Sequence, residues 1–214
     1  MGSSALAYLA ASGIGKIGIA DHDRVELSNL QRQILFETAD IGRSKAKASA
    51  DRISEMNPDC ELELFEERVT EQNASKIAEK FDIVLDGSDN FATRFAVADA
   101  CAAKKIPLVS AAVIGFSGQI SVFKPYLDET QPCYHCLVPE TPKRERNCAM
   151  EGIISPLAGI MGSFQALETI KELLGIGESL TGKLIIMDAL TSDIRKVSFS
   201  RDGDCLHHRK EASV

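Results

Sequence analysis

The chain has 214 residues, a net charge of −7, 44% hydrophobic and 26% charged residues, which fits one globular α/β domain with a sizeable core. The acidic balance argues against a nucleic-acid partner, because duplex binding relies on Lys and Arg that neutralise phosphates. No apolar run approaches the roughly 20 residues of a membrane span, and the amino terminus lacks the basic region of a secretory signal, so we expect a cytoplasmic protein.

Helices and strands are predicted to alternate through the first half of the chain. Helix patterns cover 3–12, 43–56, 71–80 and 91–105, and strand patterns cover 16–20, 61–66, 81–86 and 107–111. This order predicts an α/β, doubly wound (Rossmann-like) fold with a mainly parallel sheet and helices on both faces. Such a fold starts with a strand and a Gly-rich turn, whereas Gly2 already lies 19 positions before Asp21. The first strand and the turn are therefore expected to be missing.

The pattern changes in the second half. A strand at 118–123 follows its predecessor too closely for a helical crossover, so we expect it to be antiparallel. A polar loop at 125–151 is long enough to suggest a functional role. A helix from Pro156 to Leu174, strands at 183–188 and 194–200, and a tail complete one predicted domain over 1–214.

A polar loop follows the strand at 16–20 and contains no Gly or Pro between Asp21 and Gln33. An acid at this strand end typically binds ribose hydroxyls, although a solvated loop acid fits the position equally well. Asn29, Arg32 and Lys45 together suggest a phosphate clamp, although a lone cation is usually a surface charge. Asp89 ends another strand and would suit Mg²⁺, or would cap the helix that follows.

Two pairs of metal-type donors occur at two-residue spacing, Cys133 with Cys136 and Cys205 with His208. A Cys₃His set suits a structural tetrahedral zinc site, and the spacing favours His208 over His207. A thioredoxin-type redox pair is the alternative. Cys148 follows two arginines that would lower a thiol pKa, although a plain loop cysteine is the simpler interpretation. The other two cysteines, Cys60 and Cys101, lie in core patterns.

The run Ser28-Asn29-Leu30-Gln31-Arg32-Gln33, with Lys45, Asp89-Asn90, Cys133-x-x-Cys136 and Asn147-Cys148, resembles the ThiF/MoeB/HesA family. These are bacterial relatives of the ubiquitin-activating enzymes, and the likeness covers nearly the whole chain, with the ThiF branch most similar. The resemblance implies an adenylyltransferase with the doubly wound fold. Here the second zinc pair is Cys-x-x-His, where the family usually has Cys-x-x-Cys.

The resemblance also implies a division of roles. Asp21 would bind the ATP ribose, Arg32 and Lys45 the phosphates with catalytic effect, and Asp89 Mg²⁺, while Cys148 could bond covalently to the partner. The implied nucleotide-binding set is Gly2, Asp21, Ser28, Asn29, Leu30, Gln31, Arg32, Lys45, Asp89 and Asn90.

The implied partner is a ubiquitin-fold sulfur carrier whose C-terminal glycine is adenylated. A ThiS-like carrier of thiamine thiazole synthesis is expected first, and a MoaD-like carrier of molybdopterin synthesis is the alternative. A homodimer is also expected. Two readings from other classes stay open, a NAD-dependent dehydrogenase and a non-catalytic carrier-binding relative.

Overall fold

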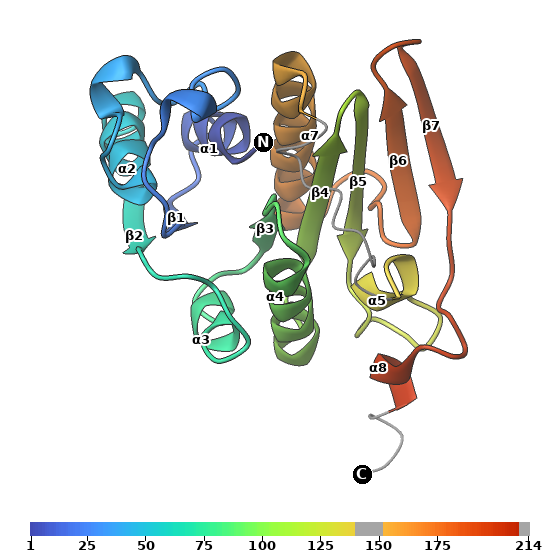
Figure 1. Cartoon of the computed structure of the whole chain (residues 1–214). Helices are drawn as coiled ribbons and strands as arrows, with labels where there is room; N and C mark the ends of the chain where they lie inside the picture. The colour runs from blue at the N-terminus through green and yellow to red at the C-terminus, as the bar shows by residue number, and fades with distance from the viewer. Residues whose placement is uncertain (140–151, 210–214) are drawn as a thin grey trace.

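The computed structural model describes residues 1–139 and 152–209 (Figure 1). Its first half alternates helices and strands as predicted, with short 3₁₀ turns after β1. In chain order these elements are α1 (Gly2–Ala11), β1 (Lys16–Ala20), η1 (Leu27–Asn29), η2 (Thr38–Asp40), α2 (Lys45–Met56), β2 (Glu61–Phe65), α3 (Ala74–Ala78), β3 (Val84–Asp86), α4 (Phe91–Lys104) and β4 (Leu108–Ile114).

The second half contributes antiparallel strands and one long helix. These elements are β5 (Ser117–Phe123), α5 (Tyr134–Leu137), α7 (Ser155–Leu174), β6 (Lys183–Asp188), β7 (Asp193–Ser198) and α8 (Leu206–Arg209). β5 pairs antiparallel with β4, with Leu108 opposite Phe123, which confirms the expected reversal. None of the described helices has the length and apolarity needed to cross a membrane.

The strands form two hydrogen-bonded sheets rather than one continuous parallel sheet. β1 and β2 form a parallel pair, and the second sheet has the order β3-β4-β5-β6-β7, in which only β3 and β4 are parallel. The ring of Phe81, just before β3, fills the space that a side chain at Gly18 of β1 would need. Side-chain packing joins the two parts instead, because Leu85 of β3 packs against the cluster that contains Ile17 and Ile19.

Helix α7 connects the two halves of the core (Figure 1). Its Leu157 and Met161 pack against Val109 of β4 and Ile120 of β5. Its Gly162 faces α1 so closely that a Cβ there would overlap the Met1 carbonyl oxygen and the Ser4 hydroxyl. α1, which carries the predicted phosphate-binding end, is therefore positioned by its contact with α7.

Capping residues explain where the helices begin and end. Asn90, and not Asp89, caps α4, because the Asn90 side chain accepts a hydrogen bond from the Thr93 backbone N–H at 2.9 Å. The alternative role for Asp89 as an N-cap is therefore wrong. Gly175 ends α7 in the left-handed region at φ 63°. α3 is shorter than expected, because the Asn73 side chain holds a turn by accepting from the Thr70 N–H.

Candidate functional site

The loop after β1 is closed on itself by its own polar groups. Asn29 is buried, and its amide oxygen accepts from the Glu26 N–H at 3.1 Å. The Asn29 carbonyl accepts from the N–H groups of Arg32 and Gln33. The Arg32 guanidinium donates to the Ser28 carbonyl at 2.9 Å. The predicted binding residues thus form a compact turn, in which Ser28 and Gln31 are exposed and Leu30 is half-buried.

Lys45 lies at the start of α2 with its ammonium group turned to this loop. Its side chain is 10% exposed, and its Nζ contacts Asp23 Oδ2 at 2.9 Å. Burial opposes ionisation of Asp23, but the hydrogen bond and charge of Lys45 prevail and lower the pKa of that carboxyl. Asp23 is a site residue that the sequence analysis missed, although an acid two positions after Asp21 was a visible signal.

Asp21 is brought into the same group. One of its carboxylate oxygens accepts from the Asp23 N–H at 2.9 Å. Burial raises the pKa of Asp21, although the nearby charge of Lys45 acts in the opposite direction. A carboxylate that has lost part of its hydration without full compensation can accept hydroxyl donors from a ligand.

The start of α1 completes this polar region. Burial, and then the charge of Arg32, lower the pKa of the Met1 amino group, which precedes the first helical residue Gly2, to about 6. A side chain at Gly87, in the loop after β3, would contact Met1. The first amides of a helix and a guanidinium both attract phosphate. Gly2 thus lies at a helix start whose backbone amides are suited to bind phosphate.

Asp89 and Asn90 are placed differently from this group. Asp89 is exposed, and Asn90 is used in capping α4. Among residues 1–139 and 152–209, no hydrogen bond or ion pair joins Asp89 to Asp21, Arg32 or Lys45.

A buried ion pair fixes the loop that carries Asp89. Arg94 of α4 lies 3.5 Å from Asp86 Oδ2, with side chains 9% and 4% exposed. Its guanidinium also donates to the Ser88 carbonyl, and to the Ala111 carbonyl at 3.1 Å. Gln165 of α7 donates to the Asp86 carbonyl at 2.8 Å.

Arg94 and Gln165 were also missed by the sequence analysis. Gln165, an amide between Phe164 and Ala166 in α7, was the visible signal. Arg94 lies on a helix pattern with nothing to distinguish it from a surface cation.

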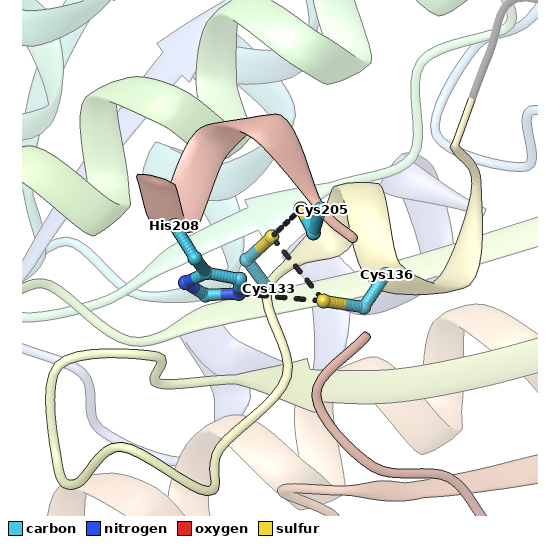
Figure 2. Close-up of side chains that lie close together, drawn as sticks. All are labelled: Cys133, Cys136, Cys205 and His208. Atoms are coloured by element: carbon cyan, nitrogen blue, oxygen red, sulfur yellow. Dashed lines mark hydrogen bonds between the residues drawn. The ribbon is translucent and has the colours of Figure 1, made fainter. Parts of the chain in front are cut away.

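The four predicted zinc ligands converge from α5 and α8 (Figure 2). Cys133 Sγ lies 3.7 Å from Cys136 Sγ and 3.7 Å from Cys205 Sγ, and His208 Nε2 lies 3.3 Å from Cys136 Sγ. A tetrahedral zinc ion with Zn–S bonds of about 2.3 Å requires sulfur atoms about 3.8 Å apart. The donor set therefore fits zinc in spacing and in chemistry, with His208 and not His207 as the fourth member.

Burial, reinforced by the neighbouring Cys136 thiol, raises the pKa of Cys133. Without a metal this thiol is therefore neutral, and a bound ion would displace its proton. The two cysteines predicted to be core, Cys60 and Cys101, are indeed buried, and burial raises the pKa of Cys101 to about 12. Cys148 lies outside the described residues.

Comparison with known proteins identifies the family. The family model described as "ThiF family" matches residues 1–207. The chain is 42% identical over 205 residues to the sulfur carrier protein ThiS adenylyltransferase of Escherichia coli (strain K12), covering 96% of this chain and 80% of that protein. It is 42% identical over 209 residues to the sulfur carrier protein adenylyltransferase of Thermus thermophilus, covering 96% and 77%.

A longer relative and a solved structure extend the comparison. The chain is 40% identical over 210 residues to the adenylyltransferase and sulfurtransferase MOCS3-1 of Zea mays, covering 97% of this chain and 44% of that protein. The crystal structure of E. coli MccB with ATP superposes with a TM-score of 0.82 at 22% identity, covering 96% of this chain and 63% of that chain. That likeness supports the fold alone. With a family model matched along almost its whole length, the chain belongs to the ThiF family.

Proposed function

We propose that the protein adenylates the C-terminal glycine carboxylate of a ubiquitin-fold sulfur-carrier protein with ATP. The observation that carries this proposal is the 42% identity, over 96% of the chain, to a protein named ThiS adenylyltransferase. The loop of Asn29 and Arg32 beside Lys45 and the start of α1 supports it, because this arrangement offers charge and amides to phosphates. A ThiS-like carrier is the first candidate.

The chemistry requires charge stabilisation and no general base. A terminal carboxylate is already ionised at neutral pH, so its oxygen can attack the α-phosphorus directly. That P–O bond forms while the bond from the α-phosphorus to the bridging oxygen breaks, and pyrophosphate leaves with the electron pair. Arg32 and Lys45 would stabilise the charge that develops on the phosphates. Asp21 would orient the ribose.

Two ions belong to the proposal. Asp89 is exposed and does not cap α4, so its carboxylate would hold Mg²⁺ on the nucleotide. Cys133, Cys136, Cys205 and His208 would hold a structural zinc ion, with no coordination position left open. We further propose that residues 1–214 form one domain. A cytoplasmic location stays a prediction.

A MoaD-type carrier is the second candidate. The 40% identity to MOCS3-1 of Zea mays, named adenylyltransferase and sulfurtransferase, supports this second candidate carrier. The two candidates share the adenylation chemistry and differ only in the carrier. One assay can therefore compare them.

Carrier-dependent exchange of labelled pyrophosphate into ATP tests the proposal. We expect exchange with a ThiS-like carrier, less with a MoaD-like carrier, and none when the terminal glycine of the carrier is removed. Lys45→Ala should reduce exchange by at least about 100-fold, whereas Lys76→Ala, on the exposed surface of α3, should leave it unchanged. No exchange with either carrier would contradict the proposal.

We also propose that the protein is a homodimer, with α7 in the interface. Ile160, Leu167 and Leu174 are 38%, 51% and 65% exposed, and their seven-residue spacing places them along one side of the helix. An apolar stripe on a helix of a globular protein suits a symmetric contact.

Sedimentation velocity tests this contact. The wild type should sediment as a dimer and Leu167→Glu as a monomer. Leu127→Glu, at an exposed position outside α7, should remain dimeric. A monomeric wild type at micromolar concentration would exclude the dimer.

A further inference from the structure

A second group of metal-type donors lies on the same side of the molecule as the Cys₃His set. It consists of Asp99 from α4, His135 from α5 and His207 from α8. His135 Nε2 lies 2.7 Å from Asp99 Oδ1, and His207 Nδ1 lies 3.6 Å from the same oxygen. Residues from three separate elements thus point nitrogen and oxygen atoms at one place.

His135 is held firmly by its surroundings, whereas His207 is exposed and able to move. The His135 ring stacks on Phe95 at 4.7 Å between ring centroids, and its side chain is only 10% exposed. The His207 ring stacks on the other side of His135 at 3.3 Å and is 41% exposed. A cavity of about 260 Å³ is lined by Asp99 and both histidines, so water can reach the donor atoms.

We propose that Asp99, His135 and His207 bind a divalent transition-metal ion of the zinc type, at a site separate from the Cys₃His set. Two imidazoles and one carboxylate suit Zn²⁺, Co²⁺ and Ni²⁺. With bonds of about 2.1 Å, neighbouring donor atoms lie roughly 3.0 to 3.4 Å apart, and the two separations from Asp99 Oδ1, 2.7 and 3.6 Å, bracket that range. Three protein ligands leave a coordination position for water.

Binding requires the donor atoms to rearrange. A metal ion lies in the plane of each imidazole that coordinates it, and the two parallel rings, at 11° to one another, have planes that do not meet at the site. Because His207 is the exposed ring, it turns out of the stack, and His135 Nε2 and Asp99 Oδ1 move apart from 2.7 Å as the ion enters between them. The ion then connects α4 to α8, independently of any nucleotide or carrier.

Cobalt titration of the metal-free full chain tests the site. The expected stoichiometry is two Co²⁺ per chain by equilibrium dialysis at micromolar metal. One ion, at the Cys₃His set, should give an intense near-ultraviolet thiolate-to-cobalt charge-transfer band. The other, with no sulfur ligand, should add only weak visible bands.

Substitutions separate the two ions. Asp99→Asn and His207→Ala should each reduce the stoichiometry from two to one and keep the charge-transfer band. Cys205→Ser should weaken that band, and Asp82→Asn, a matched exposed acid before β3, should still bind two. Circular dichroism checks that each variant is folded.

Two results would overturn the proposal. One is a single Co²⁺ in the wild type. The other is a stoichiometry that Asp99→Asn and His207→Ala either leave at two or reduce to none.

Discussion

In the loop after β1, Asp21 lowers the stability of the folded protein while remaining able to bind a ligand. Asp21 is kept in a partly desolvated position with one backbone N–H as its hydrogen-bond donor. Burial raises its pKa, so the folded protein holds the proton more tightly than the unfolded chain does. Ionisation of Asp21 therefore lowers the free energy of unfolding. This loss develops as the pH rises from the pKa of Asp21 in the unfolded chain to its higher pKa in the folded protein.

Asp21→Asn should remove this cost, because the amide oxygen can still accept from the Asp23 N–H and carries no charge. We expect the variant to match the wild type in stability near pH 3 and to be more stable at pH 7. The KM for ATP should rise by about tenfold or more, because a neutral amide binds ribose hydroxyls less strongly. Urea denaturation at several pH values and pyrophosphate exchange measure the two effects. Asp59→Asn, at an exposed turn, serves as the control.

Arg94, in contrast to Asp21, stabilises the folded protein. Its guanidinium joins the Asp86 carboxylate to two backbone carbonyls inside the protein. Removing one partner of a buried pair leaves the other charge uncompensated. Arg94 and Gln165 thus both help to hold the loop that presents Asp89.

Arg94→Ala should destabilise the protein by about 3 kcal/mol or more, and Arg94→Lys by less, since a lysine restores the charge but cannot reach all three acceptors. If the loop also orients Asp89, the Mg²⁺ requirement of exchange should rise in Arg94→Lys. Denaturation and a Mg²⁺ titration provide the measurements. Arg52→Lys, in an exposed cluster on α2, should change neither quantity.

At the scale of elements, the contact between α1 and α7 positions the amino end of α1, the end that we propose binds phosphate. Gly162 permits the backbones to approach, and the Ser4 hydroxyl donates to the Met1 carbonyl at 3.0 Å and to the Ala158 carbonyl at 3.5 Å. The amino end of α1 can lie against α7 because the facing position on that helix is a glycine.

Gly162→Ala should destabilise the protein by about 1–3 kcal/mol, because the added methyl group overlaps α1, and should raise the KM for ATP. Gly159→Ala provides a matched control in the same helix, because a Cβ there meets no atom within 4 Å. That variant should be neutral or up to about 1 kcal/mol more stable, since alanine favours helix. Equal destabilisation by both changes would refute the packing argument.

At the scale of the whole molecule, the Cys₃His set joins parts of the chain that are far apart in sequence. Cys133 and Cys205 are 72 positions apart, as are Cys136 and His208. A metal that joins α5 to α8 closes a long loop and contributes its binding energy to folding.

Removing zinc with a chelator should therefore lower the free energy of unfolding by about 3 kcal/mol, equivalent to roughly 6–12 °C in Tm. Cys205→Ser should reproduce this loss and release zinc, as measured by metal analysis. Cys60→Ala, which lies outside both donor groups, should retain zinc. Unchanged thermal unfolding after complete zinc removal would exclude a structural role.

The sequence by itself determined the features that depend on local order. The alternation of helices and strands, the glycine that ends α7 and the reversal at β5 follow from hydrophobic period, capping and connection length. The paired spacing of Cys133 with Cys136 and of Cys205 with His208 predicted the four donors that the structure brings together. Local patterns carry this information because neighbouring residues impose it directly.

Only the tertiary structure decided which distant residues meet. It separated the strands into two sheets, β1 with β2 and β3 to β7. It paired Lys45 with Asp23 and buried Arg94 against Asp86, and it brought Cys133 and Cys136 next to Cys205 and His208. These contacts join residues 8 to 75 positions apart, and their geometry depends on how helices pack on strands, which no local pattern in the sequence encodes.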